Sequence, residues 1–519
     1  MRTSVPEGGA GHLLMGWPGA ERGSHLSGTT APCDNVSGDV RAPLVGFVAL
    51  ASVFGTVAAC TDDAEDEPTV VRPSDDPAEP GAPGVGDPYY PDAGNGGYQV
   101  EHYDLDLSYD VDTAMLDGTA TIDAVSTDTL DVFNLDLHGL EVESVTVDGE
   151  EVEFERVDDE VVVDPDEDVA GGAEFEVAVE YAGVPEPIDD PALDMGVGWV
   201  ATDEGSYVLS EPNGAKTWFP SNDHPSDRAS YSFRITVPEP YSAVANGTLV
   251  EQVPGEGEST WVWDAPNPMA TYLAIVVTGE LTVAAQDAGA GGVPLRNAFP
   301  PENAEAIAEV IEPVPDMIAF FSEVYGPYPF DVYGMVFADD LFGIALEAQT
   351  FSLLPADLFG SGNVDEIIVA HELAHQWFGD AVSIEQWRDI WLNEGFATYS
   401  EWLWEEEADG VPVAESARAT YDTLSEDGRI GDPGADALFS SNVYNRGGVT
   451  LYALQVAVGD DVFFEIIQTY FEMYNGKTVT TPDFVAVAED VSGEELDDLF
   501  VDWLYREELP PFPEPAQTA

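Results

Sequence analysis

The stretch HELAH at residues 371–375 places two histidines four positions apart, with a glutamate directly after the first one. Positions i and i+4 of an α-helix lie on one face about one turn apart, so His371 and His375 can bind the same metal ion. Glu394 follows after 18 intervening residues, since 394 − 375 − 1 = 18. That length allows the first helix to end and a second helix to return to the ion. The sequence therefore predicts a metal centre with three protein ligands.

Two imidazoles and one carboxylate form a ligand set of catalytic zinc, which keeps its fourth position for water. Zinc lowers the pKa of that water towards about 7, and Glu372 can take its proton and return it to a leaving amine. The alternative is a solvated helix face, which an acid-rich chain also permits. The apolar stretches 367–370 and 377–379 argue against it, because they bury the helix and make unligated histidines costly. We expect one Zn²⁺ per chain.

The composition describes a globular chain with an extreme negative charge. Its 519 residues are 44% hydrophobic and 11% aromatic, which suits two domains with packed cores better than a disordered chain. Asp and Glu number 101 against 15 Lys and Arg, which gives a formal charge of −86. Such a surface repels nucleic acid and anionic membranes, so neither is expected as a partner.

The acids are spread along the whole chain, and Lys216 and Lys477 are its only lysines. This distribution indicates a salt-adapted surface, because molar salt shortens the Debye length to about 3 Å and screens the self-repulsion. We therefore expect the fold to loosen in dilute buffer. The alternative is a moderately acidic extracellular enzyme that needs no salt.

Residues 44–57 form an apolar run that is followed by Ala58-Ala59-Cys60. The run is shorter than the ~20 residues that span a bilayer, and small residues before a cysteine suit a signal peptidase. This pattern resembles a bacterial lipoprotein signal region at 1–60, with a true start that could lie downstream of the first residue. Lipidated at Cys60, the protein would be extracytoplasmic and anchored to the bacterial cell membrane, or else secreted; a reduced buried thiol is the alternative. Cys33 falls in the removed part, so no disulfide is expected.

The rest of the chain changes its pattern twice. Residues 61–97 are rich in Asp, Glu, Pro and Gly and predict an acidic linker. From 98 to 285 the alternation of apolar and polar residues, as in 103–109 and 142–147, predicts an antiparallel β domain of short strands. Turn signals at 147–150 and 245–248 favour a saddle or sandwich over a parallel sheet. From 286 to 510 helices dominate, and 511–519 is a tail.

Helical periodicity marks most of this second domain. A strand is expected at 332–337, and Thr481-Pro482 is expected to supply a helix N-cap and first-turn proline. The predicted helices are 303–325, 447–458, 461–474, 481–488 and 494–505.

Several motifs resemble the gluzincin aminopeptidase family typified by aminopeptidase N. They are HELAHQWFGD at 371–380, WLNEGFA at 391–397, WFPSNDHP at 218–225 and YGPYPF at 325–330, and the resemblance covers roughly 98–510. It implies an α+β multidomain protein, with an N-terminal antiparallel β saddle or sandwich domain followed by a thermolysin-like, mostly α catalytic domain.

Further positions match the family's substrate-binding residues. GIALEAQT at 343–350 resembles the segment whose glutamate grips the free α-amino group of the substrate, which assigns that role to Glu347. Glu211 matches a second residue of the same amine anchor, although Ile344 and Ala348 depart from the family pattern. Tyr444 matches the tyrosine that donates a hydrogen bond to the tetrahedral oxyanion, and a core tyrosine is the competing interpretation.

These features predict a zinc aminopeptidase that hydrolyses peptides with a free N-terminus, with Glu372 as general base and Tyr444 as oxyanion stabiliser. Two alternatives stay open. The first is a non-catalytic cell-surface binding lipoprotein, and the second is a metalloendopeptidase. The pair formed by Glu211 and Glu347 argues against the endopeptidase, because an internal peptide bond offers those carboxylates no cation.

Overall fold

The computed structural model describes residues 70, 78–193, 195–286, 288–339, 341, 343–356, 366–425 and 428–514. The expected signal region with Cys33 and Cys60, and most of the first part of the linker, lie outside these residues. The chain divides into two units, Met1–Pro68 and Thr69–Ala519, and every described residue belongs to the second. Among the described helices none combines the length and the apolar character needed to cross a bilayer.

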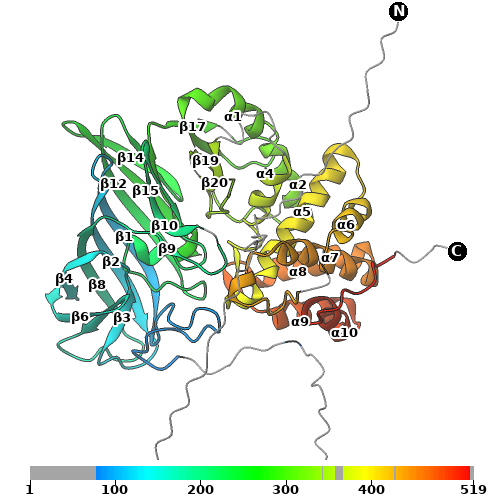
Figure 1. The fold of residues 1–519 in the computed structure, drawn as a ribbon, viewed down its shortest axis with the longest axis horizontal. Coiled ribbons are helices and arrows are strands. Elements are labelled where there is room, and N and C mark those ends of the chain that lie inside the picture. The colour runs from blue at the N-terminus through cyan, green and yellow to red at the C-terminus, as the bar shows by residue number, and fades with distance from the viewer. Residues whose placement is uncertain are drawn as a thin grey trace, which may run out of the picture. The chain divides into compact units, whose positions relative to one another are not determined.

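The first half of the described chain is a β domain, drawn from blue to green in Figure 1. Two single 3₁₀ turns, η1 (Ala215–Thr217) and η2 (Thr271–Leu273), interrupt it. Its strands are β1 (Tyr98–Asp110), β2 (Met115–Ser126), β3 (Phe133–Asp136), β4 (Glu141–Val147), β5 (Glu150–Glu151), β6 (Glu153–Val157), β7 (Glu160–Asp164), β8 (Glu174–Gly183), β9 (Ile188–Asp189), β10 (Gly196–Thr202), β11 (Gly205–Leu209), β12 (Arg228–Pro238), β13 (Ser242–Ala245), β14 (Thr248–Pro254), β15 (Glu258–Ala270) and β16 (Val276–Gly279).

The largest sheet has eight strands in the order β14-β15-β12-β1-β2-β8-β4-β5. In β1 the side chains alternate between buried and exposed, as the sequence predicts, so one face packs on the core and the other meets solvent. Its pairs are antiparallel except for β1 with β12. The prediction of short strands is wrong here, because β1 and β15 each span 13 residues.

A second sheet of five strands, β13-β16-β11-β10-β9, completes a sandwich, and β3-β7-β6 form a small third sheet. Aromatic rings join the two larger sheets: Tyr109 on β1 packs on Trp199 of β10, with ring centroids 4.9 Å apart. The indole of Trp263 on β15 donates a hydrogen bond to the carbonyl of Ala243 on β13. Every residue of β11 is buried, so this strand is covered on both faces. The Asn246-Gly247 turn signal is a corner between sheets, because the strands β13 and β14 on either side of it belong to different sheets.

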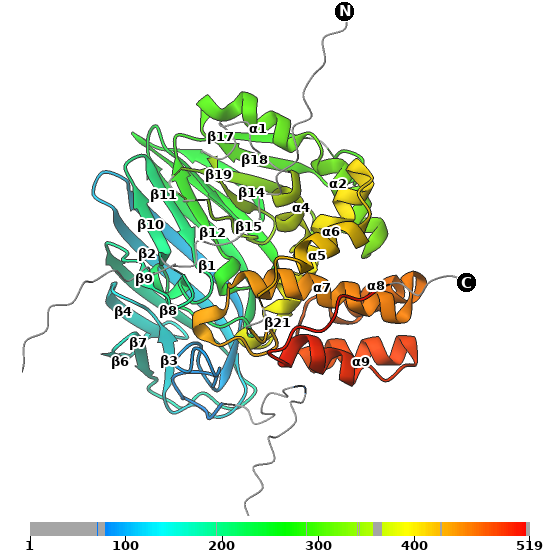
Figure 2. The same cartoon turned by 45° about the vertical axis from the view of Figure 1, so that its right-hand side comes forward.

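The second half of the described chain is mostly helical and carries the metal motif. A four-stranded sheet, β17-β18-β19-β20, lies beside α1 and α4 in both cartoon views (Figures 1 and 2). The elements are β17 (Thr282–Gln286), β18 (Leu295–Phe299), β19 (Tyr333–Ala338), β20 (Ser352–Pro355), β21 (Val382–Ile384), β22 (Lys477–Val479), α1 (Ala304–Ile311), α2 (Val314–Val324), α4 (Glu366–Ala374), α5 (Trp391–Asp409), α6 (Val413–Tyr421), α7 (Ser441–Val458), α8 (Asp460–Tyr474), α9 (Thr481–Ser492) and α10 (Asp497–Phe500), with 3₁₀ turns η3 (Pro301–Asn303), η4 (Trp387–Asp389) and η5 (Ala435–Ala437) and a π-helical turn (Val501–Tyr505).

Four helix predictions need correction. The helix expected at 447–458 begins six residues earlier, at Ser441. The helix expected at 303–325 is broken between α1 and α2, because Pro313 has no N–H to donate to the preceding turn. The helix expected at 494–505 begins at Asp497 and widens into the π-helical turn. The N-cap of α9 is Thr480, which forms a capping box with Asp483, so the prediction of Thr481 as N-cap is one residue late.

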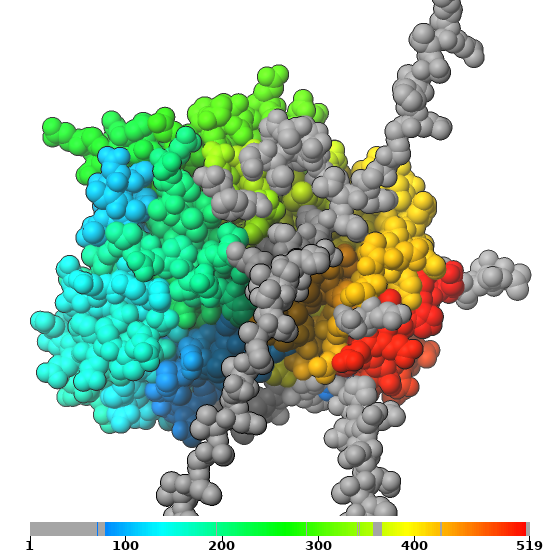
Figure 3. All heavy atoms as spheres, viewed as in Figure 1, coloured from blue at the N-terminus to red at the C-terminus, as the bar shows by residue number. Residues whose placement is uncertain are grey.

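The predicted linker is folded over its last part. Residues 78–97, which we call the strap, pack against both domains instead of forming a tether. Asp87 is buried; its Oδ2 accepts a hydrogen bond from the backbone N–H of Trp387 at 3.0 Å and lies 3.3 Å from Nε2 of His224. The hydroxyl of Tyr89 donates to Asp432 at 2.7 Å. One short segment thus joins the β domain to two loops of the helical domain, and Figure 3 shows its dark-blue atoms at the base of both.

The WFPSNDHP motif explains why the strap docks where it does. Oδ1 of Asn222 accepts the backbone N–H of Asn95, and the side chain of Asn222 donates to the buried carboxylate of Asp227. The backbone N–H of Asn222 donates a hydrogen bond to the hydroxyl of Tyr103 on β1. The motif is therefore a polar docking surface inside the β domain, built to receive the strap.

Two buried carboxyl groups outside the set of metal ligands predict how stability depends on pH. Burial raises the pKa of Asp227 to about 7 and the pKa of Asp389 to about 7. Each group therefore binds a proton more tightly in the fold than in the unfolded chain, so its contribution to stability is complete below pH about 4 and is lost as the pH rises through 7. Between pH 8 and pH 6 each should add about 1.4 kcal/mol to the free energy of unfolding.

Chemical denaturation at constant salt and saturating zinc measures this change. Asp389→Asn is the matched variant, because an amide oxygen can still accept the hydrogen bonds that Thr481 donates to Oδ1 from its N–H and its hydroxyl. Between pH 8 and pH 6 the free energy of unfolding of this variant should rise less than that of the parent protein. An equal rise in the free energy of unfolding of both proteins would contradict the raised pKa of Asp389.

Candidate metal centre

The three predicted ligands converge. His371 lies in α4, His375 follows one residue after the end of α4, and Glu394 lies in the first turn of α5. Oε2 of Glu394 is 3.3 Å from Nε2 of His371 and 3.6 Å from Nε2 of His375. Ligands about 2.0 to 2.1 Å from a tetrahedral ion are about 3.3 to 3.4 Å from one another, so these atoms match the edges of a zinc tetrahedron. All three side chains are buried.

The outer nitrogens of both rings are already engaged. Nδ1 of His371 lies 2.6 Å from Oε1 of Glu401, and Nδ1 of His375 lies 3.1 Å from the carbonyl oxygen of Phe378. These acceptors fix the proton on Nδ1 and leave Nε2 free to bind a metal. Gly379 makes the second contact fit, since it has a φ of +134° and an added Cβ would lie 3.2 Å from Nδ1 of His375.

The chemistry of Glu394 fits a bound cation. Burial alone would raise the pKa of Glu394, but the two imidazoles outweigh it and lower that pKa to about 2. Among the described residues no hydrogen bond satisfies its buried Oε2, although two ring nitrogens lie close by. An ionised oxygen that is near two nitrogens without being aligned for hydrogen bonds is what a shared metal ion requires.

Glu372 lies between the two histidines on α4 and is also buried. Burial raises the pKa of Glu372 to about 7, with Glu347 and Glu394 adding to the increase and the histidines opposing it. A carboxyl group with a pKa close to neutrality can accept a proton and release it again. The arrangement therefore suits proton transfer beside the ion.

Two glycines bring Tyr444 to the centre. Gly395 follows the third ligand on α5 and meets Gly447 on α7, where an added Cβ on either residue would lie less than 3.0 Å from the other backbone. This close crossing of α5 and α7 requires glycine at both positions. Tyr444 lies one turn before Gly447 and its ring stacks on the ring of His371, with centroids 5.9 Å apart. The tyrosine thus lies next to a metal ligand.

Two further carboxylates from different domains meet the third ligand. Glu211 follows β11 in the β domain and Glu347 precedes β20, yet each has a carboxylate oxygen within 4.8 Å of one on Glu394 and of one on the other. Burial and the neighbouring carboxylates raise the pKa of Glu211 well above its usual range; burial also raises the pKa of Glu347. Oε1 of each is buried without a hydrogen-bond partner among the described residues. The cluster can accept a second cation next to the metal position.

Every predicted site residue of the two domains is therefore brought to one place, and only Cys60 lies outside the described residues. Glu401 was not predicted as a site residue. Its signal was present, because Glu401 lies seven residues after Glu394 and so projects from the same face of α5 two turns later. Many acids share this spacing in so acidic a chain, and the sequence alone could not single out this one.

The comparisons with known proteins agree with this geometry. The model of the peptidase M1 N-terminal domain matches residues 99–273, and the model of the peptidase family M1 domain matches residues 310–503. An M1 zinc metallopeptidase from Deinococcus radiodurans aligns over 84% of this chain and 100% of its own, with 31% identity and a TM-score of 0.76. This chain belongs to peptidase family M1. Zinc is accordingly the metal of the centre, and the predicted fold class is confirmed.

Other relatives of this M1 peptidase differ in length. Aminopeptidase 2 of Candida albicans is 26% identical over 64% of this chain and 38% of that protein. Human glutamyl aminopeptidase is 28% identical over 59% of this chain and 34% of that protein. The match thus spans little more than a third of these curated relatives. A variant of the Deinococcus peptidase, solved with a Tyr-Ser-Ala substrate, aligns with 31% identity over 83% of this chain and a TM-score of 0.76.

Glu401 provides a test of how this M1 peptidase holds its metal. Glu401→Gln keeps an acceptor for His371 but removes the charge that supports the ring, so zinc affinity should fall about 10- to 100-fold. Competition with a chelator measures the affinity. Glu406→Gln is the control, since Glu406 is an exposed acid on the same helix. Equal zinc affinity in both variants would show that Glu401 does not orient the ligand.

Proposed function

We propose that this protein is a zinc-dependent aminopeptidase, which releases residues from the free N-terminus of peptides. The observation that carries the proposal is the pair of unpartnered carboxylate oxygens on Glu211 and Glu347, close to the third metal ligand. A substrate ammonium would satisfy both at once. The curated relatives named aminopeptidases support the same activity.

Charge explains why such a site selects chain ends. A protonated α-amine between Glu211 and Glu347 forms charge-assisted hydrogen bonds and relieves the repulsion between the two carboxylates. A peptide bound through its middle has no cation to place there, and the buried charges stay unpaired. Because the anchor lies beside the ligand Glu394, a peptide whose α-amine is held there has its first peptide bond nearest to the ion.

The reaction divides among the remaining residues. His371, His375 and Glu394 would hold zinc, which supplies an activated water and polarises the peptide carbonyl when bound. Glu372 takes the proton of the attacking water and passes it to the departing amine, which its raised pKa suits. Tyr444, on the same side as His371, donates its hydroxyl proton in a hydrogen bond to the oxyanion.

The alternative functions have less support. A non-catalytic binding protein would have no need for the ligand set together with Glu372, Glu401 and Tyr444. A metalloendopeptidase would have to accommodate internal peptide bonds against the charge of Glu211 and Glu347. Neither alternative accounts for the buried, unpartnered oxygens of these two carboxylates.

We also propose that the protein acts outside the cytoplasm, anchored through a lipid on Cys60, with an acidic surface adapted to high salt. The apolar run at 44–57 and the small residues before Cys60 support the anchor. The charge of −86 and the presence of two lysines support the salt adaptation. The mass of the mature N-terminal peptide distinguishes a lipidated Cys60 from a free thiol.

The amine anchor can be tested directly with a pair of substrates. An aminoacyl-anilide should be hydrolysed, and the same compound with an acetylated amine should not. Glu347→Gln should lower kcat/KM for the free amine about 10- to 100-fold, because a hydrogen bond to a charged group contributes about 1.5 to 3 kcal/mol. Glu309→Gln, on an exposed face of α1, is the control. Hydrolysis of the acetylated compound at a comparable rate would contradict the proposal.

The role of Tyr444 has its own test. Tyr444→Phe should retain zinc and lower kcat about 10²- to 10³-fold, because it removes one oxyanion donor. Metal analysis and steady-state kinetics measure the two effects. Tyr421→Phe is the matched control, since its hydroxyl donates to the carbonyl of Pro510 and not to the site. Near-normal turnover of Tyr444→Phe would assign Tyr444 to the core.

A further inference from the structure

The side chain of Gln376 connects the metal motif to the amine anchor. Gln376 directly follows the ligand His375 and is fully buried. Its Nε2 donates to the carbonyl oxygen of Glu347 at 3.0 Å, and its Oε1 accepts the backbone N–H of Thr350 at 2.7 Å. One amide thus binds both ends of the four-residue segment 347–350. Oε1 also accepts a hydrogen bond from the hydroxyl of Tyr328 at 3.2 Å, which fixes the orientation of the amide.

The segment that Gln376 holds has a strained backbone. Thr350 has a φ of +68°, a conformation that a β-branched residue rarely adopts. Such a conformation persists only where its surroundings determine it. The bond from the N–H of Thr350 to Gln376 is one of the contacts that do so. The position of the Glu347 carboxylate therefore depends on a backbone that would relax if released.

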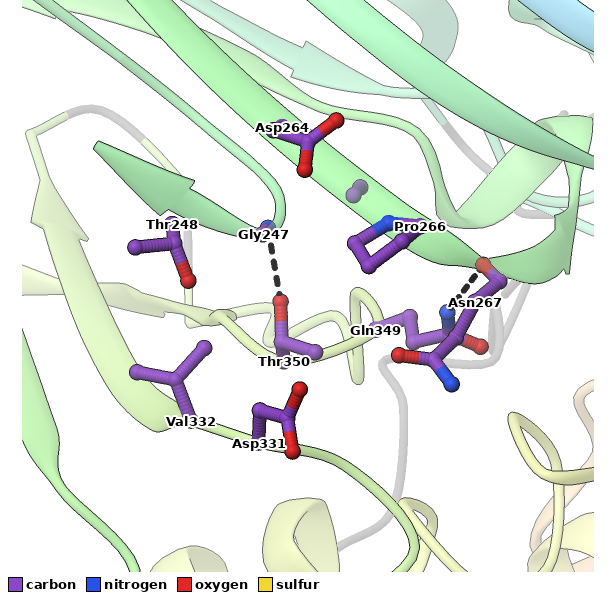
Figure 4. A pocket seen from close by; sticks show the side chains of 10 residues that line it. Gly247, Thr248, Asp264, Pro266, Asn267, Asp331, Val332, Gln349 and Thr350 are labelled. Carbon is purple, nitrogen blue, oxygen red and sulfur yellow. Dashed lines mark hydrogen bonds between the residues drawn. The ribbon is translucent and has the colours of Figure 1, made fainter. Parts of the chain in front are cut away.

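The other side of the same segment is attached to the β domain. Figure 4 shows the N–H of Gly247 donating to Oγ1 of Thr350, at 2.9 Å, and Gln349 donating to the carbonyl of Asn267, at 3.0 Å. Asn246 adds a bond to the carbonyl of Gln349 at 2.9 Å. A cavity of about 120 Å³ lies between these attachments, and none of the three metal ligands lines it. The segment is thus placed from the β domain on one side and from the metal motif on the other.

We propose that Gln376 is a positioning residue that sets the distance between the metal and the substrate amine. This positioning role rests on the proposed function and extends it, since neither the motif resemblance nor the relatives assign a role to this side chain. The ligand His375 and the clamp Gln376 are neighbours in the chain, so any movement of the metal motif carries the carbonyl of Glu347 with it. The anchor and the metal then keep one fixed separation, which a substrate must match with its amine and its first carbonyl.

A pair of inhibitors measures this separation without turnover. A leucine hydroxamate can reach both the metal and the amine anchor, whereas the same hydroxamate lacking the amine can reach only the metal. The inhibition constant of the amine-free compound, divided by that of the leucine hydroxamate, reports how well the anchor is placed. In Gln376→Met, which keeps the length of the side chain but none of its three hydrogen bonds, this ratio should fall about tenfold or more, because small misplacements are costly. The inhibition constant of the amine-free compound and the zinc content should stay unchanged.

Four further measurements sharpen the outcome. Gln376→Asn is too short to span the segment and should also lower the ratio, while its polar amide makes misfolding less of a concern. Gln455→Met is the control, since Gln455 is a partly buried amide bonded to Tyr399 on α5 and not to the anchor. In steady-state kinetics the Gln376 variants should raise KM more than they lower kcat. In a Glu347→Gln background Gln376→Met should have little further effect on the ratio, because the group that it positions is already altered.

The failures of the two proposals are distinguishable. If the parent protein binds both hydroxamates equally, the aminopeptidase proposal fails. If the parent protein prefers the amine and the zinc-loaded Gln376 variants keep that preference, only the positioning role is overturned. Loss of zinc from both Gln376→Met and Gln376→Asn would also overturn it, because Gln376 would then support the metal motif and not the anchor.

Discussion

The centre of this molecule concentrates negative charge in a largely buried place, and a bound cation makes that arrangement stable. Glu211, Glu347, Glu372 and Glu394 are drawn from both domains into one neighbourhood. Without zinc, burial and mutual repulsion favour the protonated forms of most of these groups. Zinc binding offsets this cost for Glu394 and the histidines. The remaining unpaired charge then defines the place for a second cation, and the substrate can supply it.

Because the two carboxylates of the anchor come from different domains, the junction between the domains is part of the site. Arg228, at the start of β12, donates to the carbonyl of Asp380 at 2.6 Å, five residues beyond a metal ligand. The strap joins His224 to the loop before α5 through Asp87. These contacts attach the β domain, which carries Glu211, to the helical domain, which carries the metal ligands. A substitution at the junction would therefore alter binding as well as stability.

The sequence predicted the parts of this structure that local rules determine. Helical spacing predicted the metal ligands, and the alternation of apolar and polar residues predicted the strands. The motif resemblance predicted the roles of Glu211, Glu347 and Tyr444. The break at Pro313 and the N-cap at Thr480 are local features that the periodicity did not resolve, whereas the larger errors come from contacts between distant segments. The strap has the composition of a linker, and contacts with residues more than a hundred positions away, such as Asn222 and His224, order it. Glu401 and Gln376 were missed for the same reason, since their roles appear only when their partners are in place.

The acidic surface and the acidic site obey different physics, although both are built from Asp and Glu. In molar salt the Debye length is about 3 Å, so surface charges cannot attract a cationic peptide from a distance. The oxygens of Glu211 and Glu347 lie within 4.8 Å of each other and are buried, so they act on an ammonium by contact, where mobile ions screen little. Recognition of the substrate amine can thus persist in conditions that suppress long-range attraction. A site that depends on contact needs accurate placement, and Gln376 and the domain junction provide it.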